Sequence, residues 1–311
     1  MKYAPVVLFV YKRPEETRRT LNALLANEGA DRSHLFVFSD GPRSRDEEAP
    51  VAEVRSLFSG LSGFAGLTLR SSETNKGLAR SVIDGVNEVL RDHDRAIVIE
   101  DDLVTSRYFL RFMNEALEKY RDDERICCIH GFSPPTRHPE IPYFLRRGAD
   151  CWGWAAWERG WRIFSPDARR LYDEIKEKKL SREFDRGGVF PYTKMLKAQA
   201  EGRSDSWAIR WYASAFLAEK YTLQSNRMLV ENIGFGRGAT HCSGGRDHGI
   251  VLDEKPVVFD REAEQEPDFL RNEYRRFLRT ERPSLAARAL RKLRSLATRN
   301  FGGNNFGERE R

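Results

Sequence analysis

Three consecutive carboxylates, Glu100, Asp101 and Asp102, follow a short apolar run at 96–99. The run is rich in β-branched residues and has no polar interruption, which is typical of a strand buried on both faces of a parallel sheet. Parallel sheets bind ligands at the carboxyl ends of their strands. Acids crowded at such an edge repel one another and lose hydration, so a cation or a hydroxyl-rich ligand would stabilise them. We therefore expect a Mg²⁺ or Mn²⁺ site here; the alternative is a solvated acidic turn.

Three earlier strand-like runs, at 6–11, 35–38 and 67–70, also end in polar residues. They alternate with helix-like segments, which is the βα rhythm of a parallel sheet. The runs bring Arg13, Asp40, Asn75 and Lys76 to the edge where the acids are expected. An aspartate there can accept from a base N–H, and an arginine can reach a base or a phosphate. The ordinary alternatives are a surface arginine, an Asp-Gly turn and a solvated lysine.

The hydrophobic spacing also predicts helices at 79–90, 106–120, 194–200 and 207–220. The segment 148–164 carries four tryptophans between glycines, which form either core or a platform for a sugar ring or base. The segment 234–249 is rich in glycine and includes Arg237 and His241, which predicts a mobile loop. His241 is interpreted either as a ligand of metal or phosphate or as a loop histidine with no special role.

The composition predicts a globular protein of a reducing cytosol. The 311 residues are 40% hydrophobic, the formal net charge is +6, and the four cysteines have neither zinc-ligand nor disulfide-framework spacing. No apolar stretch approaches the roughly 20 residues of a spanning helix. Residues 271–311 are strongly basic, and near 285–296 they have amphipathic spacing that predicts a helix on an anionic membrane surface. A solvated basic helix and a disordered tail are the alternatives.

Taken together, these residues meet the needs of an enzyme that uses a nucleotide-linked sugar. A divalent ion bridging a diphosphate to a carboxylate stabilises charge on the leaving group, and a separate carboxylate removes a proton from the acceptor hydroxyl. Seven segments resemble the GT-A-fold glycosyltransferases in their order along the chain, with N-acetylglucosaminyltransferase I and bacterial family-2-like sugar transferases as the suggested relatives. The segments are VVLFVYKRPEETRRTLNALL, LFVFSDG, NKGLARSV, AIVIEDD, CWGWAAWERGW, SDSW and RMLVENIGFGRGATH.

The resemblance implies a Rossmann-like α/β fold with a mainly parallel, twisted sheet and helices on both faces. The resemblance covers about Val6 to His241. We therefore expect one domain over 1–270, with a nucleotide-binding half at 1–104 and an acceptor or catalytic half at 105–270, and the composition sets the basic tail at 271–311 apart. In the first half, Arg13 and Asp40 would hold the nucleotide, with Asp40 on the uracil.

The resemblance also assigns roles at the acids. Glu100 and Asp101 would contact the donor sugar and the ribose, and Asp102 would ligate the metal directly. Asp205, in SDSW, falls where the family keeps its general base; the alternative is that Asp205 caps the helix predicted from Trp207. The segment around Arg237 lies beside the family's loop over the donor.

The sequence hypothesis is therefore an inverting, metal-dependent transferase. It would move a hexose or N-acetylhexosamine from a UDP-sugar to a hydroxyl of a glycan or lipid-linked acceptor, in cell-surface polysaccharide assembly on the inner face of the membrane. A sugar nucleotidyltransferase and a non-catalytic binder of sugar or nucleic acid are the alternatives. Nucleic acid is disfavoured because acids at the strand ends would repel phosphate without a metal, and no nucleic-acid motif occurs.

Overall fold

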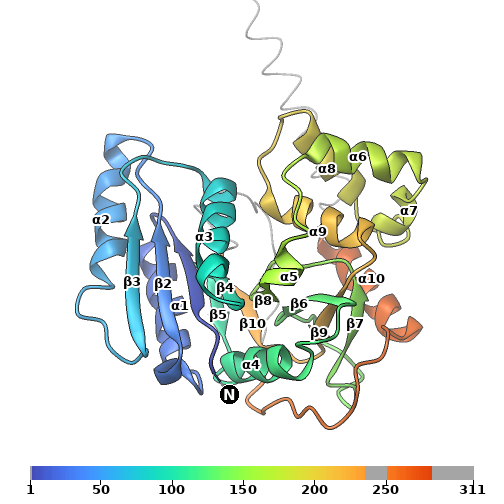
Figure 1. Cartoon of the computed structure of the whole chain (residues 1–311), viewed down its shortest axis with the longest axis horizontal. Helices are drawn as coiled ribbons and strands as arrows, with labels where there is room; N and C mark the ends of the chain where they lie inside the picture. The colour runs from blue at the N-terminus through green and yellow to red at the C-terminus, as the bar shows by residue number, and fades with distance from the viewer. Residues whose placement is uncertain (1, 235–250, 282–311) are drawn as a thin grey trace, which may run out of the picture.

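The computed structural model of the chain describes residues 2–234 and 251–281. Its main feature is an eight-stranded sheet in the order β3-β2-β1-β4-β8-β6-β9-β7 (Figure 1). The strands are β1 (Val6–Val10), β2 (His34–Ser39), β3 (Gly66–Ser71), β4 (Arg95–Glu100), β6 (Ile126–His130), β7 (Tyr143–Arg147), β8 (Trp154–Trp157) and β9 (Tyr221–Ser225).

Most of these strands share one direction. β1 is parallel to β2 and β4, β2 is parallel to β3, and β6 is parallel to β9. β8 runs antiparallel to both β4 and β6, and β7 runs antiparallel to β9. The prediction of a mainly parallel α/β sheet is confirmed. The first predicted strand ends one residue early, at Val10, and the other three extend slightly beyond their predicted ranges.

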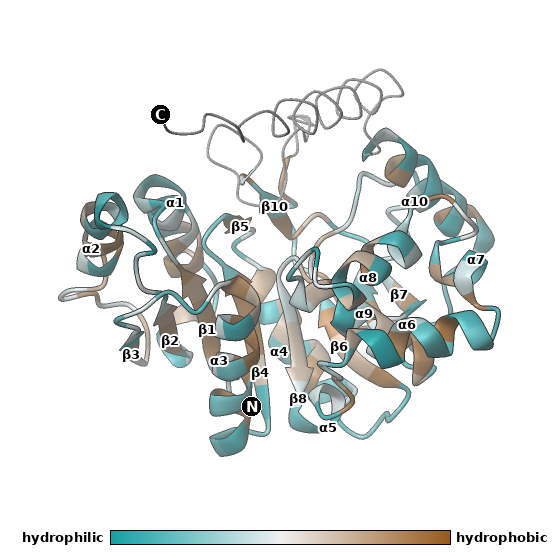
Figure 2. Ribbon diagram, turned by 90° about the horizontal axis from the view of Figure 1, so that it is seen from above, coloured by the Kyte–Doolittle hydropathy of each residue, from teal (hydrophilic) through white to brown (hydrophobic). Residues whose placement is uncertain are grey.

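Helices cover both faces of the sheet, as predicted. α1 (Pro14–Leu25), α2 (Glu48–Ser56) and α4 (Phe109–Lys119) pack on one face, and α3 (Leu78–Asp92) and α9 (Trp207–Leu217) pack on the other. Figure 2 shows α1 and α2 on the side of the strands opposite to α3. Side chains alternate along β1, so Leu8 joins the first core and Phe9 joins the second.

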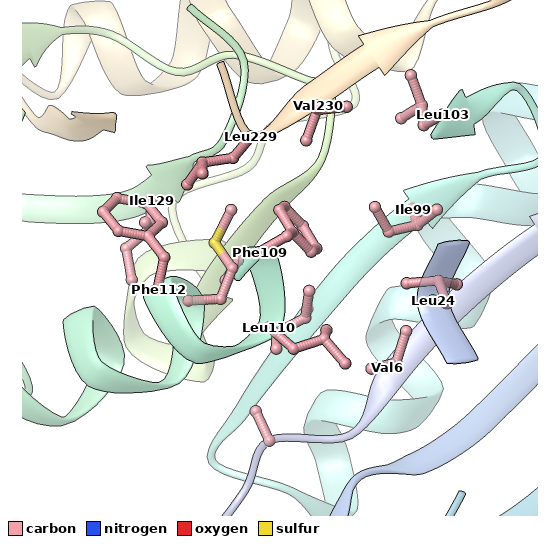
Figure 3. Packing of buried hydrophobic residues seen from close by; sticks show 14 of the residues in the cluster. Val6, Leu24, Ile99, Leu103, Phe109, Leu110, Phe112, Ile129, Leu229 and Val230 are labelled. Carbon is pink, nitrogen blue, oxygen red and sulfur yellow. The ribbon is translucent and has the colours of Figure 1, made fainter. Parts of the chain in front are cut away.

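The first core is built between α4 and the strands. Phe109, Leu110 and Phe112 of α4 point toward Ile99 of β4 and Ile129 of β6 (Figure 3). The helix predicted over 106–120 therefore exists, but it starts three residues later than predicted. A two-stranded antiparallel sheet, β5 (Leu103–Thr105) with β10 (Val230–Asn232), lies beside this core.

The tryptophan-rich segment is mostly core. Trp154, Trp157 and Trp161 are buried, whereas Trp152 is only partly buried. Trp154 stacks on Trp207 at a ring-centroid distance of 5.5 Å, which fixes the start of α9 against the start of β8. The platform interpretation therefore survives only for Trp152.

The remaining helices lie outside α9 and at the end of the described chain. α6 (Ala168–Glu177), α7 (Ser181–Phe184) and α8 (Tyr192–Ala200) share an apolar cluster with α9. α5 (Glu158–Trp161) follows β8, and the short helices η1 (Ala30–Arg32) and η2 (Arg45–Glu47) flank β2. α10 (Asp268–Glu281) buries Tyr274 and Leu278 against Val189.

Part of the predicted tail belongs to the folded structure. α10 crosses the predicted boundary at 270, and the amphipathic stretch near 285–296 lies outside the described residues. Within 2–234 and 251–281, no helix is both long and apolar enough to cross a bilayer.

Candidate functional site

The acid triplet lies at the carboxyl end of β4, tied to the end of β1 and the start of α1. Glu100 ends β4, and the backbone N–H of Tyr11 donates to Asp101 Oδ2 (3.1 Å). Thr20 Oγ1 donates to the Asp101 carbonyl (2.9 Å). Arg13 Nη1 lies 3.1 Å from Asp102 Oδ2. The structure thus brings Arg13 and the three acids together, as the sequence predicts.

The acids carry a strong electrostatic penalty. Burial, and then the charge of Asp102, raise the pKa of Glu100 to about 8 and that of Asp101 to about 7. Burial also raises the pKa of Asp102, although Arg13 opposes this shift. The three acids are only partly exposed and lie beside one another, which is unlike a fully solvated acidic turn.

The end of β10 approaches Asp102 closely. The Ile233 N–H donates to the Asp102 carbonyl (2.8 Å), and the Gly234 N–H donates to Asn232 Oδ1 (2.8 Å). A Cβ at position 234 would lie only 2.0 Å from Asp102 Oδ2. Glycine is therefore needed here for close approach rather than for an unusual backbone angle. Arg237, predicted to contact the donor, and His241, for which both interpretations stay open, lie outside the described residues.

A second group of predicted residues gathers where β2 ends and α3 begins. The Asp40 carboxylate accepts the backbone N–H groups of Gly41 (2.9 Å), Lys76 (2.8 Å) and Gly77 (2.9 Å). Asn75 Nδ2 donates to the Gly41 carbonyl (2.8 Å). Asp40 therefore does more than form an Asp-Gly turn, since it joins two loops at the same edge of the sheet.

Lys76 faces a small cavity beside this group. The cavity has a volume of about 400 Å³, and its wall includes Ser39, Asp40 and Ser71. No described carboxylate forms an ion pair with Lys76. Its ammonium group is therefore available to a ligand that enters from this edge.

Glu47, which the sequence analysis did not identify, links β1 to the segment after β2. It accepts hydrogen bonds from the Tyr11 hydroxyl, from Lys12 Nζ and from the Arg43 N–H. The hydrogen bonds from Lys12 and Tyr11 lower the pKa of Glu47 to about 2. Burial, and then Glu47, raise the pKa of Tyr11 to about 12. No sequence signal separates Glu47 from its acidic neighbours, because its partners are distant in the chain.

Asp205 lies just before α9. Since α9 leads into the amino end of β9, its own start lies at the carboxyl edge of the sheet, the edge that carries the acid triplet. The Asp205 side chain is 64% exposed, and Arg210 Nη2 lies 3.1 Å from its Oδ1. Ser206, whose side chain accepts from the Ile209 N–H, caps α9. The alternative that Asp205 caps this helix is therefore wrong.

The acids suit a metal that arrives with a ligand better than a resident one. Within 2–234 and 251–281, no group of three or more His, Cys, Asp and Glu side chains is arranged to hold a metal ion. Asp102 is a hard oxygen donor next to two further carboxylates. Mg²⁺ and similar ions commonly bind one or two carboxylates and complete their coordination with phosphate oxygens and water. The donor set fits that mode.

Comparisons with known proteins find similar solved structures but do not assign the chain to a family. No protein-family model matches the chain, and no curated protein matches it. The solved structures it resembles include mannosyltransferase PcManGT from Pyrobaculum calidifontis in complex with GDP-Man and Mn²⁺ (15% identity, TM-score 0.35). They also include S. aureus TarS 1-349 (9% identity, TM-score 0.39).

These matches are partial. The first covers 56% of this chain and 47% of the mannosyltransferase, and the second covers 74% of this chain and 60% of TarS 1-349. The chain thus spans less than two thirds of either structure. The resemblance to N-acetylglucosaminyltransferase I stays a prediction.

Proposed function

We propose that the protein is a metal-dependent glycosyltransferase of the GT-A type that uses a UDP-sugar. The observation that carries this proposal is the crowded, partly buried acid triplet at the carboxyl end of β4, next to Arg13. Buried carboxylates at a sheet edge are costly unless a cation or hydroxyl groups compensate them. A nucleoside diphosphate sugar binds together with a metal ion, which is the cation, and its ribose and donor sugar supply the hydroxyl groups.

Within this proposal each residue has a defined task. Asp102 ligates Mn²⁺ or Mg²⁺, which when bound stabilises negative charge on the departing nucleotide. Glu100 and Asp101 accept hydrogen bonds from ribose or sugar hydroxyls, and Arg13 offers its guanidinium to a phosphate or base. Lys76 supplies a further cation at the same edge.

The Asp40 group orders the nucleotide end of the site. Asp40 Oδ1 already accepts two backbone N–H groups and Oδ2 accepts one, so Oδ2 keeps one further acceptor site. We therefore keep Asp40 and Asn75 as nucleotide contacts, with Asp40 nearest the uracil. Arg237 is proposed as a donor contact from the segment after Gly234.

Asp205 is proposed as the general base. It is exposed at the same edge of the sheet, and Arg210 holds its carboxylate in place. A base must reach the acceptor hydroxyl, and an exposed carboxylate at the edge satisfies that need. Transfer would invert the anomeric carbon by direct displacement. Trp152, which is only partly buried, is placed to stack against an acceptor ring.

The acceptor is proposed to be a glycan or a lipid-linked glycan, and residues beyond 281 to bind an anionic membrane surface on its cytoplasmic side. The setting would be the assembly of cell-surface polysaccharide. The amphipathic spacing near 285–296 motivates the membrane role.

The test is a thermal-shift panel of UDP, GDP, dTDP and CMP, each with Mn²⁺ and with chelator. UDP should stabilise wild type more with Mn²⁺ than with chelator, and Asp102→Ala should lose this difference. Asp31→Ala, an exposed acid whose side chain is 80% accessible, is the matched control and should respond like wild type. Stabilisation by UDP that is the same with Mn²⁺ and with chelator would contradict the assignment of the acids.

A further inference from the structure

A large basic cavity lies at the β7 end of the sheet, between α7 and α10. Its volume is about 860 Å³, within the range of small-molecule sites. Eight of its lining residues are arginine or lysine, and two are glutamate. None of the residues of the acid triplet or the Asp40 group lines it. A concave surface of one charge sign concentrates ligands of the opposite sign.

The two glutamates in the wall are already paired. Glu183 Oε1 lies 2.6 Å from Arg147 Nη1. Glu266, whose side chain is 7% exposed, lies 2.7 Å from Arg146 Nη2 and 3.5 Å from Arg271 Nε. Glu266 also attracts Arg186 electrostatically, but two glutamates cannot balance the eight cations of the wall.

Arg186 is the clearest sign of a missing partner. Its side chain lines the cavity, and its Nε is buried without a hydrogen-bond partner. Among the described residues, none accepts a hydrogen bond from the Arg186 guanidinium, which lies 4.9 Å from the centre of the Tyr212 ring. An unmet buried donor is costly, and the planar guanidinium matches the oxygens of a phosphate group.

The backbone holds two of these cations in unfavourable conformations. Arg186 has φ of 53° and Lys179 has φ of 56°, values at which glycine is the easier residue. Both side chains line the cavity. Two positions with a left-handed backbone conformation, where glycine would be easier, thus carry a basic residue that lines the cavity.

We propose that this cavity binds a small phosphate-bearing anion, with Arg186 as its central contact. Arg276 and Arg279 of α10 are exposed, line the cavity and have no described acidic partner, so they would bind at its rim. The site is separate from the proposed donor site and does not rest on the proposed function. It gives the first part of the basic tail a role within the folded protein.

The experiment measures binding of inorganic pyrophosphate to the full chain by calorimetry. Chelator is present throughout, so that metal-assisted binding at the acid triplet is excluded, and sodium chloride of matched ionic strength is the blank. Wild type and Asp102→Ala should bind equally. Arg186→Gln should weaken binding at least about 10-fold, because it removes charge-assisted hydrogen bonds.

A double variant keeps the test valid if Arg186→Gln does not fold. Arg276→Gln with Arg279→Gln changes only exposed residues and should also weaken binding, whereas Arg91→Gln, an exposed arginine in the last turn of α3, should not. Absence of binding in wild type would overturn the proposal. Equal binding by wild type and the double variant would overturn it too.

A second arm identifies the source of the phosphate. Sedimentation with phosphatidylglycerol vesicles that is lost in Arg186→Gln would indicate a lipid head group. Pyrophosphate binding combined with vesicle binding that does not depend on Arg186 would indicate a soluble phosphorylated ligand. Both results support the phosphate site, and neither changes the expectations for Asp102.

Discussion

Gly234→Ala perturbs the position of Asp102 without changing its charge. The new Cβ would lie 2.0 Å from Asp102 Oδ2, whereas carbon and oxygen in contact need about 3.3 Å. The carboxylate must therefore move by roughly 1.3 Å, which is the difference between these distances. Such a shift breaks the 3.1 Å contact with Arg13. Misplacement of a reacting or binding group by about 1 Å can cost about 100-fold in rate.

The assay has two parts. We expect Gly234→Ala to lose the Mn²⁺-dependent stabilisation by UDP and about 100-fold in transfer rate. Its stability in chelator should change by about 1 kcal/mol or less, because the end of one side chain can rotate away. An unchanged response to Mn²⁺ and UDP would refute the reasoning.

Gly60→Ala is the matched control. A Cβ at position 60 meets nothing within 4 Å, but the φ of 68° makes alanine unfavourable there by about 1 kcal/mol or more. This variant should lower the melting temperature and leave the nucleotide response intact. The pair thus separates loss of stability from loss of site geometry.

Three further predictions follow from the structure. Asp205→Ala should keep Mn²⁺-dependent UDP binding in calorimetry but lose sugar transfer, and unchanged turnover would reject it as the base. Burial lowers the pKa of His130 below its usual 6.5, so the free energy of unfolding should fall as pH drops below about 6.5, by up to about 1.4 kcal/mol per pH unit. His130→Gln should reduce this dependence in urea titrations at several pH values; an unaltered slope would assign it to other groups. A chain ending before Pro283 should bind anionic vesicles more weakly than the full chain, and equal binding would exclude the membrane role.

The expected pH effect has a local structural cause. His130 Nε2 accepts the backbone N–H of Trp152 (3.1 Å), and its Nδ1 lies 3.2 Å from Gln224 Oε1. The first contact requires an unprotonated Nε2, so a proton there leaves the N–H of Trp152 without its acceptor. Asp150, 3.7 Å away, favours the proton, and Arg146 opposes it, but burial is the largest effect.

The parallel half of the sheet could be predicted because each of its strands is a short, continuous run of apolar residues in the sequence. Residues 96–99 show this most clearly: each is buried in β4, and the polar residues begin where the strand ends. The convergence of Arg13 with the acids followed from topology alone, since neighbouring parallel strands end at one edge.

The other strands of the sheet were not predicted, because tertiary packing rather than a local sequence pattern determines them. Cys128 and Ala155 lie in central strands whose residues have no alternating pattern, and β8 reads as part of a tryptophan cluster. Glu47 and the cavity around Arg186 also depend on residues that are distant in the sequence. Their contacts come from segments that sequence spacing does not bring together, such as Tyr11 with Glu47.

The most direct test of the central claim is the release of UDP from UDP-sugars by the purified protein, measured with Mn²⁺ and with chelator. We expect slow, Mn²⁺-dependent release from at least one UDP-hexose or UDP-N-acetylhexosamine, and we expect Asp102→Ala to abolish it. Release that persists in Asp102→Ala would contradict this claim, as would pyrophosphate release from a nucleoside triphosphate and a sugar phosphate.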